Sequence, residues 1–140
     1  MREALQAGRQ ALPDCLPNPP VGCVLVRAGR VIARGFTQPP HRNHAEAMAL
    51  SQMFGGAEGV CAYVTLEPCS FHGRTPSCAQ ALIAAGIRRV VVGILDPDPR
   101  NNGAGIAMLV SAGVDVRSGV LEADVHRDLD AYLALSDNRG

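Results

Sequence analysis

Along this chain of 140 residues, segments with two different spacings of hydrophobic residues follow one another in turn. Runs of apolar and β-branched residues predict strands, and apolar residues that recur every three or four positions predict helices. The strand-like runs cover residues 21–26, 31–36, 60–66, 90–95 and 114–116, and the helix-like segments cover residues 2–12, 44–54, 77–85, 103–112 and 122–135. This alternation of strands and helices is typical of the α/β class.

A predicted hairpin and one predicted buried strand define the expected sheet. Residues 21–26 and 31–36 are separated by a short glycine-containing segment, which predicts an antiparallel hairpin. Residues 90–95 have no polar face, so we expect a central strand with helices on both sides. The prediction is a three-layer α/β/α sandwich with a mixed five-stranded sheet. A chain of this length can bury one core, so residues 1–140 are expected to form a single domain.

The charges of the chain balance, with thirteen basic and thirteen acidic residues. Nucleic acids are recognised through basic surfaces and through aromatic side chains that stack on bases. This chain has two tyrosines, three phenylalanines and no tryptophan. We therefore expect a small-molecule partner and no nucleic acid.

The chain has no apolar stretch long enough for a membrane span, which needs about 18 residues. Its first residues, Met1 to Leu5, lack the apolar core of a signal peptide. We therefore expect a cytoplasmic protein without a membrane partner. In that reducing compartment the five cysteines need not form disulfides.

Four residues suggest a metal-dependent enzyme. His44 and Glu46 open a predicted helix, whereas Cys69 and Cys78 flank a loop rich in proline and glycine. One histidine and two cysteines suit Zn²⁺, and three protein ligands leave a fourth position for water, as in catalytic zinc sites. Glu46 is placed to transfer protons as a general acid and base. We therefore predict His44, Cys69 and Cys78 as zinc ligands and Glu46 as the catalytic residue.

Simpler interpretations remain open for several of these residues. Glu46 could be an ordinary acidic residue in a first helical turn. A structural zinc site would need a fourth ligand, for which His72 is the nearby candidate. Cys23 and Cys61 lie in strand-like runs and are predicted to be core residues.

These residues fit a known pattern, the His-x-Glu and Pro-Cys-x-x-Cys signature of zinc nucleobase deaminases, except that eight residues separate the two cysteines. Over nearly its whole length the chain resembles the deaminase domain of bacterial riboflavin biosynthesis enzymes, in the cytidine deaminase-like superfamily, where this spacing is normal. The resemblance is carried by Asn-Pro-Pro-Val-Gly at residues 18–22, His-Ala-Glu at 44–46, the segment 63–78 and Asp-Pro-Asp-Pro at 96–99.

The resemblance implies a zinc-dependent hydrolytic deamination. The substrate would be the phosphoribosylated diaminopyrimidinone of riboflavin biosynthesis, and ammonia would be released. Asn18 would bind the substrate ring, Asp96 would lie near it, and Arg74 would help to hold the ribose phosphate. Superfamily members commonly form dimers and tetramers, so we expect a homodimer or a homotetramer.

The chain departs from the family on the substrate side of the site. Phe71 and then His72 follow Cys-Ser, where the family usually has histidine first. Asp98 replaces a usual asparagine and adds a negative charge that would disfavour a nearby phosphate. We therefore include Phe71, His72 and Asp98 among the candidate substrate-binding residues, and a different small heterocycle or nucleoside remains an alternative.

Two further alternatives concern partners and activity. The reductase domain that usually follows in the family is not expected within these residues, so a separate reductase would act in the same pathway, or the protein would serve another pathway. A nucleic-acid deaminase and a catalytically silent zinc module are less favoured interpretations.

Overall fold

The structure is a computed structural model that describes residues 1–71 and 76–134. Its strands are β1 (Gly22–Arg27), β2 (Arg30–Phe36), β3 (Val60–Leu66), β4 (Arg89–Ile94) and β5 (Asp115–Ser118). Its helices are α1 (Arg2–Arg9), α2 (Ala45–Ser51), α3 (Cys78–Ala84), α4 (Ala104–Ser111) and α5 (Glu122–Leu133). Two candidate residues, His72 and Arg74, lie outside the described residues.

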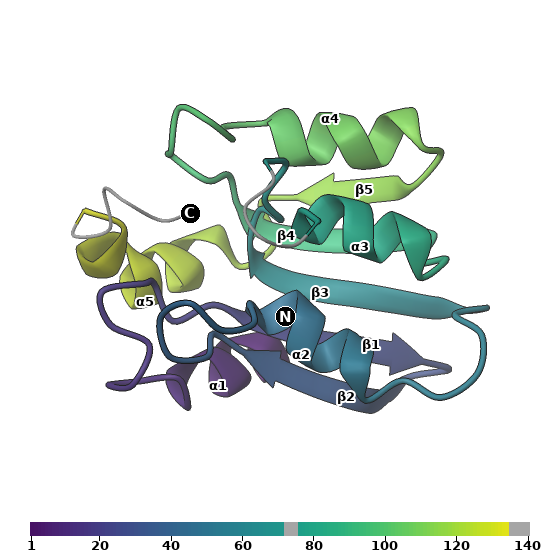
Figure 1. Ribbon diagram of the computed structural model, residues 1–140, viewed down its shortest axis with the longest axis horizontal. Helices are drawn as coiled ribbons and strands as arrows, with labels where there is room; N and C mark the ends of the chain where they lie inside the picture. The colour runs from purple at the N-terminus through teal and green to yellow at the C-terminus, as the bar shows by residue number, and fades with distance from the viewer. Residues whose placement is uncertain (72–75, 135–140) are drawn as a thin grey trace.

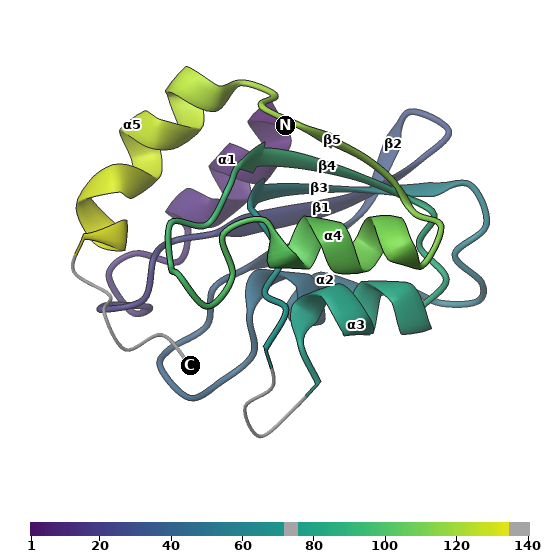
Figure 2. The same ribbon diagram turned by 90° about the horizontal axis from the view of Figure 1, so that it is seen from above.

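The strands form one mixed sheet in the order β2-β1-β3-β4-β5. The first hairpin is antiparallel, β1 is also antiparallel to β3, and β3, β4 and β5 are parallel. Helices α2, α3 and α4 cover one face of the sheet, and α1 and α5 cover the other (Figures 1 and 2). The predicted three-layer sandwich with a mixed five-stranded sheet is confirmed.

The hairpin turn is tighter than the sequence pattern suggested. Strand pairing extends to Arg27 and Arg30, which leaves only Ala28 and Gly29 in the turn. Both residues have positive φ angles, 51° and 77°. This conformation matches the twist of two-residue hairpins and is easily adopted by glycine.

The core lies between the sheet and its helices, and its largest fully buried side chains include Leu25, Leu82, Leu109 and Leu129. Cys23 is buried in it, as expected. The prediction for Cys61 is wrong, because this residue is only half-buried. Its side chain alternates with those of Val60 and Ala62 along β3 and so faces the other side of the sheet.

The topology brings four separate segments to one edge of the sheet. β3 and β4 run in parallel, so the segments that follow them begin at the same edge. Because β1 runs opposite to both β2 and β3, the segment before β1 and the loop after β2 reach this edge as well. The candidate residues at positions 18, 44, 69 and 96 come from these four segments.

Within residues 1–71 and 76–134, none of the helices is long and apolar enough to cross a membrane.

Candidate active site

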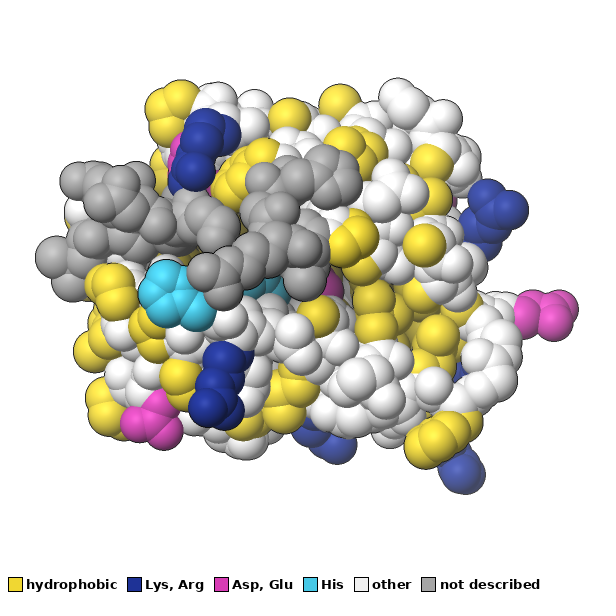
Figure 3. All heavy atoms as spheres, viewed as in Figure 1, with side chains coloured by type: hydrophobic (Ala, Val, Ile, Leu, Met, Phe, Trp, Pro, Cys, Tyr) yellow, Lys and Arg dark blue, Asp and Glu magenta, His cyan; other side chains and the backbone are white. Residues whose placement is uncertain are grey.

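A cavity of about 870 Å³ opens where these four segments meet. This volume is in the range of small-molecule sites. Its described lining includes Asn18, His41, Glu46, Cys69, Phe71 and Asp96. The space-filling view shows histidine side chains exposed beside hydrophobic ones on this face of the molecule (Figure 3).

His44, Cys69 and Cys78 converge in this cavity. His44 is the N-cap residue of α2, Cys78 is the first residue of α3, and Cys69 follows β3. Their three ligand atoms all lie within 4.8 Å of one another. The Nδ1 atom of His44 is 3.2 Å from the Sγ atom of Cys78 and 3.9 Å from that of Cys69. The helix starts and the strand end thus place three metal-binding side chains together.

The spacing of these atoms fits Zn²⁺. Tetrahedral zinc, with bonds of about 2.0–2.1 Å to nitrogen and about 2.3 Å to sulfur, places the two ligand atoms about 3.6 Å apart. The two distances from His44, 3.2 Å and 3.9 Å, lie on either side of this value. Among the described residues this group has three members, which suits a site with an open coordination position. The alternative with His72 as a fourth ligand lies outside the described residues.

The two cysteines differ in how easily they lose a proton. A side-chain hydrogen bond with Cys78, together with the interaction with His44, lowers the pKa of the Cys69 thiol to about 4. The backbone N–H of Cys78 also donates a 3.2 Å hydrogen bond to Sγ of Cys69. Because the thiolate is the form that binds a metal, these contacts prepare Cys69 to act as a ligand.

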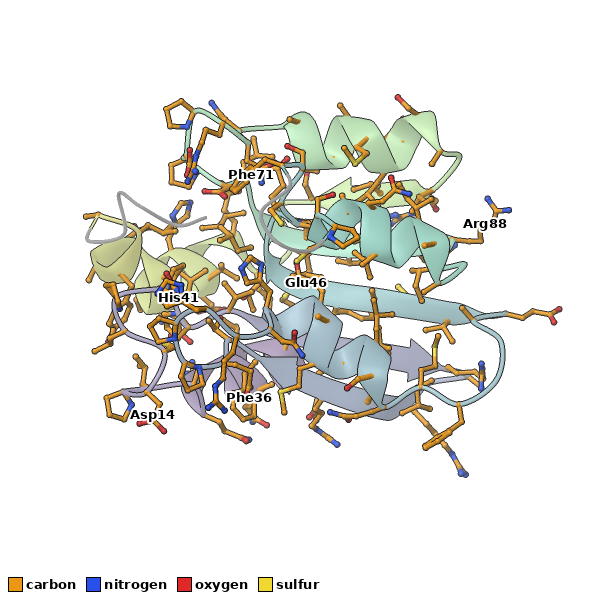
Figure 4. The ribbon with its side chains drawn as sticks, viewed as in Figure 1. Asp14, Phe36, His41, Glu46, Phe71 and Arg88 are labelled. Carbon is orange, nitrogen blue, oxygen red and sulfur yellow. The ribbon has the colours of Figure 1, made fainter. Side chains whose placement is uncertain are left out.

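Glu46 lies in the first turn of α2 and is 4% exposed. Burial raises the pKa of its carboxyl group to about 7. A carboxyl group with such a pKa can both accept and donate a proton near neutral pH. Figure 4 shows Glu46 on α2, with Phe71 above it and His41 on the loop to its left.

The substrate-binding candidates have different positions. Asn18, Phe71 and Asp96 line the cavity. Asp98 is not among the described lining residues, and its carboxylate instead accepts hydrogen bonds from Arg100, the shortest 2.7 Å long. The charge expected to disfavour a phosphate is therefore already paired.

The sequence interpretation missed Glu67, which lines the cavity and is 3% exposed. Its carboxylate accepts hydrogen bonds from the backbone N–H groups of Asp96, Gly103 and Ile106. These donors lie 29 to 39 residues further along the chain. An acidic residue directly before Pro68 and Cys69 was the only available signal, and it did not reveal these partners.

The loop after β2 supplies further lining residues that were not predicted as part of the site. Thr37 and Arg42 line the cavity together with His41. The backbone N–H of Gln38 donates to the carbonyl oxygen of Asn43, which closes this loop. Its composition is not distinctive, so the sequence alone did not indicate a binding role.

Comparison with known proteins identifies related chains. Residues 1–94 match the family described as the cytidine and deoxycytidylate deaminase zinc-binding region. The chain is 40% identical over 124 residues to the diaminohydroxyphosphoribosylamino-pyrimidine deaminase of Buchnera aphidicola. This match covers 89% of the chain and 84% of the Buchnera protein.

Two longer proteins are also similar. The riboflavin biosynthesis protein RibD of Escherichia coli is 44% identical over 127 residues, which cover 91% of this chain and 35% of RibD. The crystal structure of a diaminohydroxyphosphoribosylaminopyrimidine deaminase/5-amino-6-(5-phosphoribosylamino)uracil reductase from Thermotoga maritima has a TM-score of 0.87 and 38% sequence identity. That match covers 96% of this chain and 39% of the Thermotoga chain. The chain thus spans somewhat more than a third of the length of these two proteins.

Proposed function

The chain belongs to the cytidine and deoxycytidylate deaminase family, and on this premise we propose that it is a zinc-dependent hydrolytic deaminase of an aminopyrimidine. The proposed substrate is the phosphoribosylated diaminopyrimidinone of riboflavin biosynthesis. The names and identities of the Buchnera and Escherichia coli relatives support this choice. The observation that carries the proposal is a buried carboxylate, Glu46, in the same cavity as the His44, Cys69 and Cys78 group.

In this proposal His44, Cys69 and Cys78 hold the metal. Bound Zn²⁺ would supply Lewis-acid activation of water near neutral pH. Glu46 accepts a proton from the attacking water and donates it to the ring nitrogen, and a second transfer through the same carboxyl group releases the amine as ammonia. Its pKa of about 7 suits both directions of transfer.

The substrate contacts are also proposals. Asn18, before β1, and Asp96, after β4, both line the cavity and offer an amide and a carboxylate to the substrate ring. Arg74 is proposed to hold the ribose phosphate, because a guanidinium group binds phosphate through two parallel hydrogen bonds.

The test is ammonia release from the phosphoribosylated diaminopyrimidinone by the zinc-loaded chain. Glu46→Gln should retain zinc and lower kcat by about 100-fold or more, because it removes the proton-transferring group and leaves the ligands in place. Glu58→Gln, which changes an exposed glutamate, is the matched control and should retain activity. Full activity of Glu46→Gln would reject the catalytic assignment.

We also propose partners for the reaction. The Thermotoga name pairs the deaminase with a reductase, so we propose that the deaminated product passes to a reductase. Assay of the product with a purified reductase of that specificity tests this step. A homodimer or homotetramer is proposed as the active form, and light scattering of the zinc-loaded protein measures its mass.

A further inference from the structure

Phe71 and Asp96 line the same cavity from two different segments, one after β3 and one after β4. Asp98 and Arg100 connect them. The Cζ atom of Arg100 lies 4.4 Å from the centroid of the Phe71 ring, within the range of a cation–π contact. The backbone N–H of Asp98 donates a 3.0 Å hydrogen bond to Oδ1 of Asp96.

The pair formed by Asp98 and Arg100 is tightly bonded. Nη2 of Arg100 lies 2.7 Å from Oδ2 of Asp98, and Nε lies 3.1 Å and 3.2 Å from the two carboxylate oxygens. The backbone N–H of Arg100 donates a further hydrogen bond of 2.9 Å to Oδ1 of Asp98. The Asp98 side chain is only 9% exposed. Several bonds to one guanidinium group fix its orientation.

Among the described lining residues of the cavity, Phe71 is present and Arg100 is not. Of the two residues in the cation–π contact, Phe71 is therefore the one that borders the cavity. The guanidinium cation is attracted electrostatically to the face of the ring, which favours a fixed position of the ring. An aromatic ring held in this way can stack, in an offset arrangement, on a flat heterocycle in the cavity.

We propose that Phe71 stacks on the heterocyclic ring of the substrate and is a specificity-determining residue, and that Asp98 and Arg100 are positioning residues that orient it. The inference rests on the proposed function, because the heterocycle is the aminopyrimidine of that reaction. It assigns to Asp98 an indirect effect on substrate binding, exerted through Arg100 and Phe71.

The test compares two ligands, the free diaminopyrimidinone base and its ribosyl phosphate. Calorimetry on the zinc-loaded full chain in the Glu46→Gln background measures binding without turnover, and KM and kcat are measured in the active chain. Phe71→Leu should weaken binding of both ligands by about tenfold, because the stacked ring is common to both. Phe71→Tyr should restore binding.

The positioning pair is tested in the same way. Arg100→Met should weaken both ligands by about three- to tenfold and raise KM, with kcat changed by less than about twofold. Arg100→Lys, which keeps the cation, should recover part of the loss. Arg89→Met is the matched control, because Arg89 pairs with Asp115 at the other end of β4, and it should bind as the parent does.

The stacking assignment is overturned if Phe71→Leu binds both ligands as the parent does, or if Phe71→Leu weakens binding of the ribosyl phosphate but not of the free base. The positioning assignment is overturned if Arg100→Met binds normally while Phe71→Leu binds weakly. Zinc content and thermal unfolding identify a variant that fails to fold, and the conservative variants Phe71→Tyr and Arg100→Lys then decide. If the active chain releases no ammonia but both ligands bind and respond as expected, the proposed reaction fails and the stacking assignment stands. If neither ligand binds the parent, both fail.

Discussion

The carboxylate of Glu67 accepts a 3.0 Å hydrogen bond from the backbone N–H of Asp96, which joins the segments that follow β3 and β4. The same carboxylate accepts hydrogen bonds from the backbone N–H groups of Gly103, at 2.9 Å, and Ile106, at 3.1 Å. Glu67 is 3% exposed, so water cannot replace these bonds. The position of Asp96 in the cavity therefore depends on a buried acceptor that does not itself need to contact the substrate.

This arrangement predicts a loss of stability in Glu67→Gln. The amide keeps the shape of the side chain but turns one acceptor oxygen into a donor that faces backbone N–H groups. We expect the free energy of unfolding to fall by about 2–3 kcal/mol. Urea unfolding of the zinc-loaded protein measures the change, and Glu58→Gln at an exposed position is the control. Equal stability of the two variants would contradict the assignment.

The group formed by His44, Cys69 and Cys78 predicts which cysteine variants of the protein retain zinc. The parent is expected to hold about one zinc ion per chain. Cys78→Ser and Cys69→Ser should hold much less, because each substitution removes a thiolate ligand. Cys61→Ser should keep it, since Cys61 is outside the group of ligand atoms. Metal analysis after gel filtration distinguishes these outcomes.

Removal of the metal should also lower thermal stability. A ligand that binds only the folded state at 100 times its Kd stabilises it by about 2.7 kcal/mol. Thermal unfolding with and without a chelator should therefore show a lower Tm for the chelated parent and no further effect on Cys78→Ser. An equal shift in Cys78→Ser would place the metal elsewhere.

The contacts of His126 on α5 predict that the stability of the protein depends on pH. A hydrogen bond with Asp130 raises the pKa of its imidazole above the usual 6.5, and Glu122 adds to the effect. Because the pKa is higher in the folded state, the protonated imidazole stabilises the fold. This contribution is complete at pH values below the unfolded-state pKa, and it is lost as pH rises through the folded-state pKa. The stability difference between the parent and Asp130→Asn should therefore shrink as pH rises from about 6 to about 9.

Nuclear magnetic resonance titration of His126 provides the direct measurement, with a lower pKa expected in Asp130→Asn. Asp124→Asn is the control, because Asp124 pairs with Arg127 on the same helix. An identical His126 titration in the parent and Asp130→Asn would reject the assigned interaction.

The fold was largely predictable because its strands are distinct in the sequence. β3 covers the predicted residues, and β4, a nearly continuous apolar run, is an internal strand of the sheet with helices on both faces, as expected (Figure 2). Helix ends were less predictable: α2 ends at Ser51, although the apolar pattern continued to residue 54. Beyond Ser51, the Gln52 side chain still bonds to the backbone of Arg34 in β2, but Phe54 is 91% exposed and gains no burial that would favour a longer helix.

Some parts of the candidate site could be predicted from the sequence, and others could not. His44, Cys69 and Cys78 were predicted as a group from their residue types, but they come together because the sheet order brings their segments to one edge, and the sequence predicted the strands without that order. The function of Glu67 as an acceptor depends on backbone groups of a distant segment, which no local pattern reveals. The pairing of Asp98 with Arg100 is local in sequence, but its contact with Phe71 depends on the fold.

Gly35 predicts how closely α2 must approach the sheet. A Cβ atom at this position would collide with the carbonyl oxygen of Ala45 and lie 2.7 Å from the backbone nitrogen of Ala49, both in α2. Gly35→Ala should therefore displace the helix that carries Glu46, lower the free energy of unfolding by about 1–3 kcal/mol and reduce kcat/KM. Gly56→Ala, where a Cβ atom meets nothing within 4 Å, is the control for urea unfolding and ammonia release. Parent-like behaviour of Gly35→Ala would show that α2 can shift without loss of function.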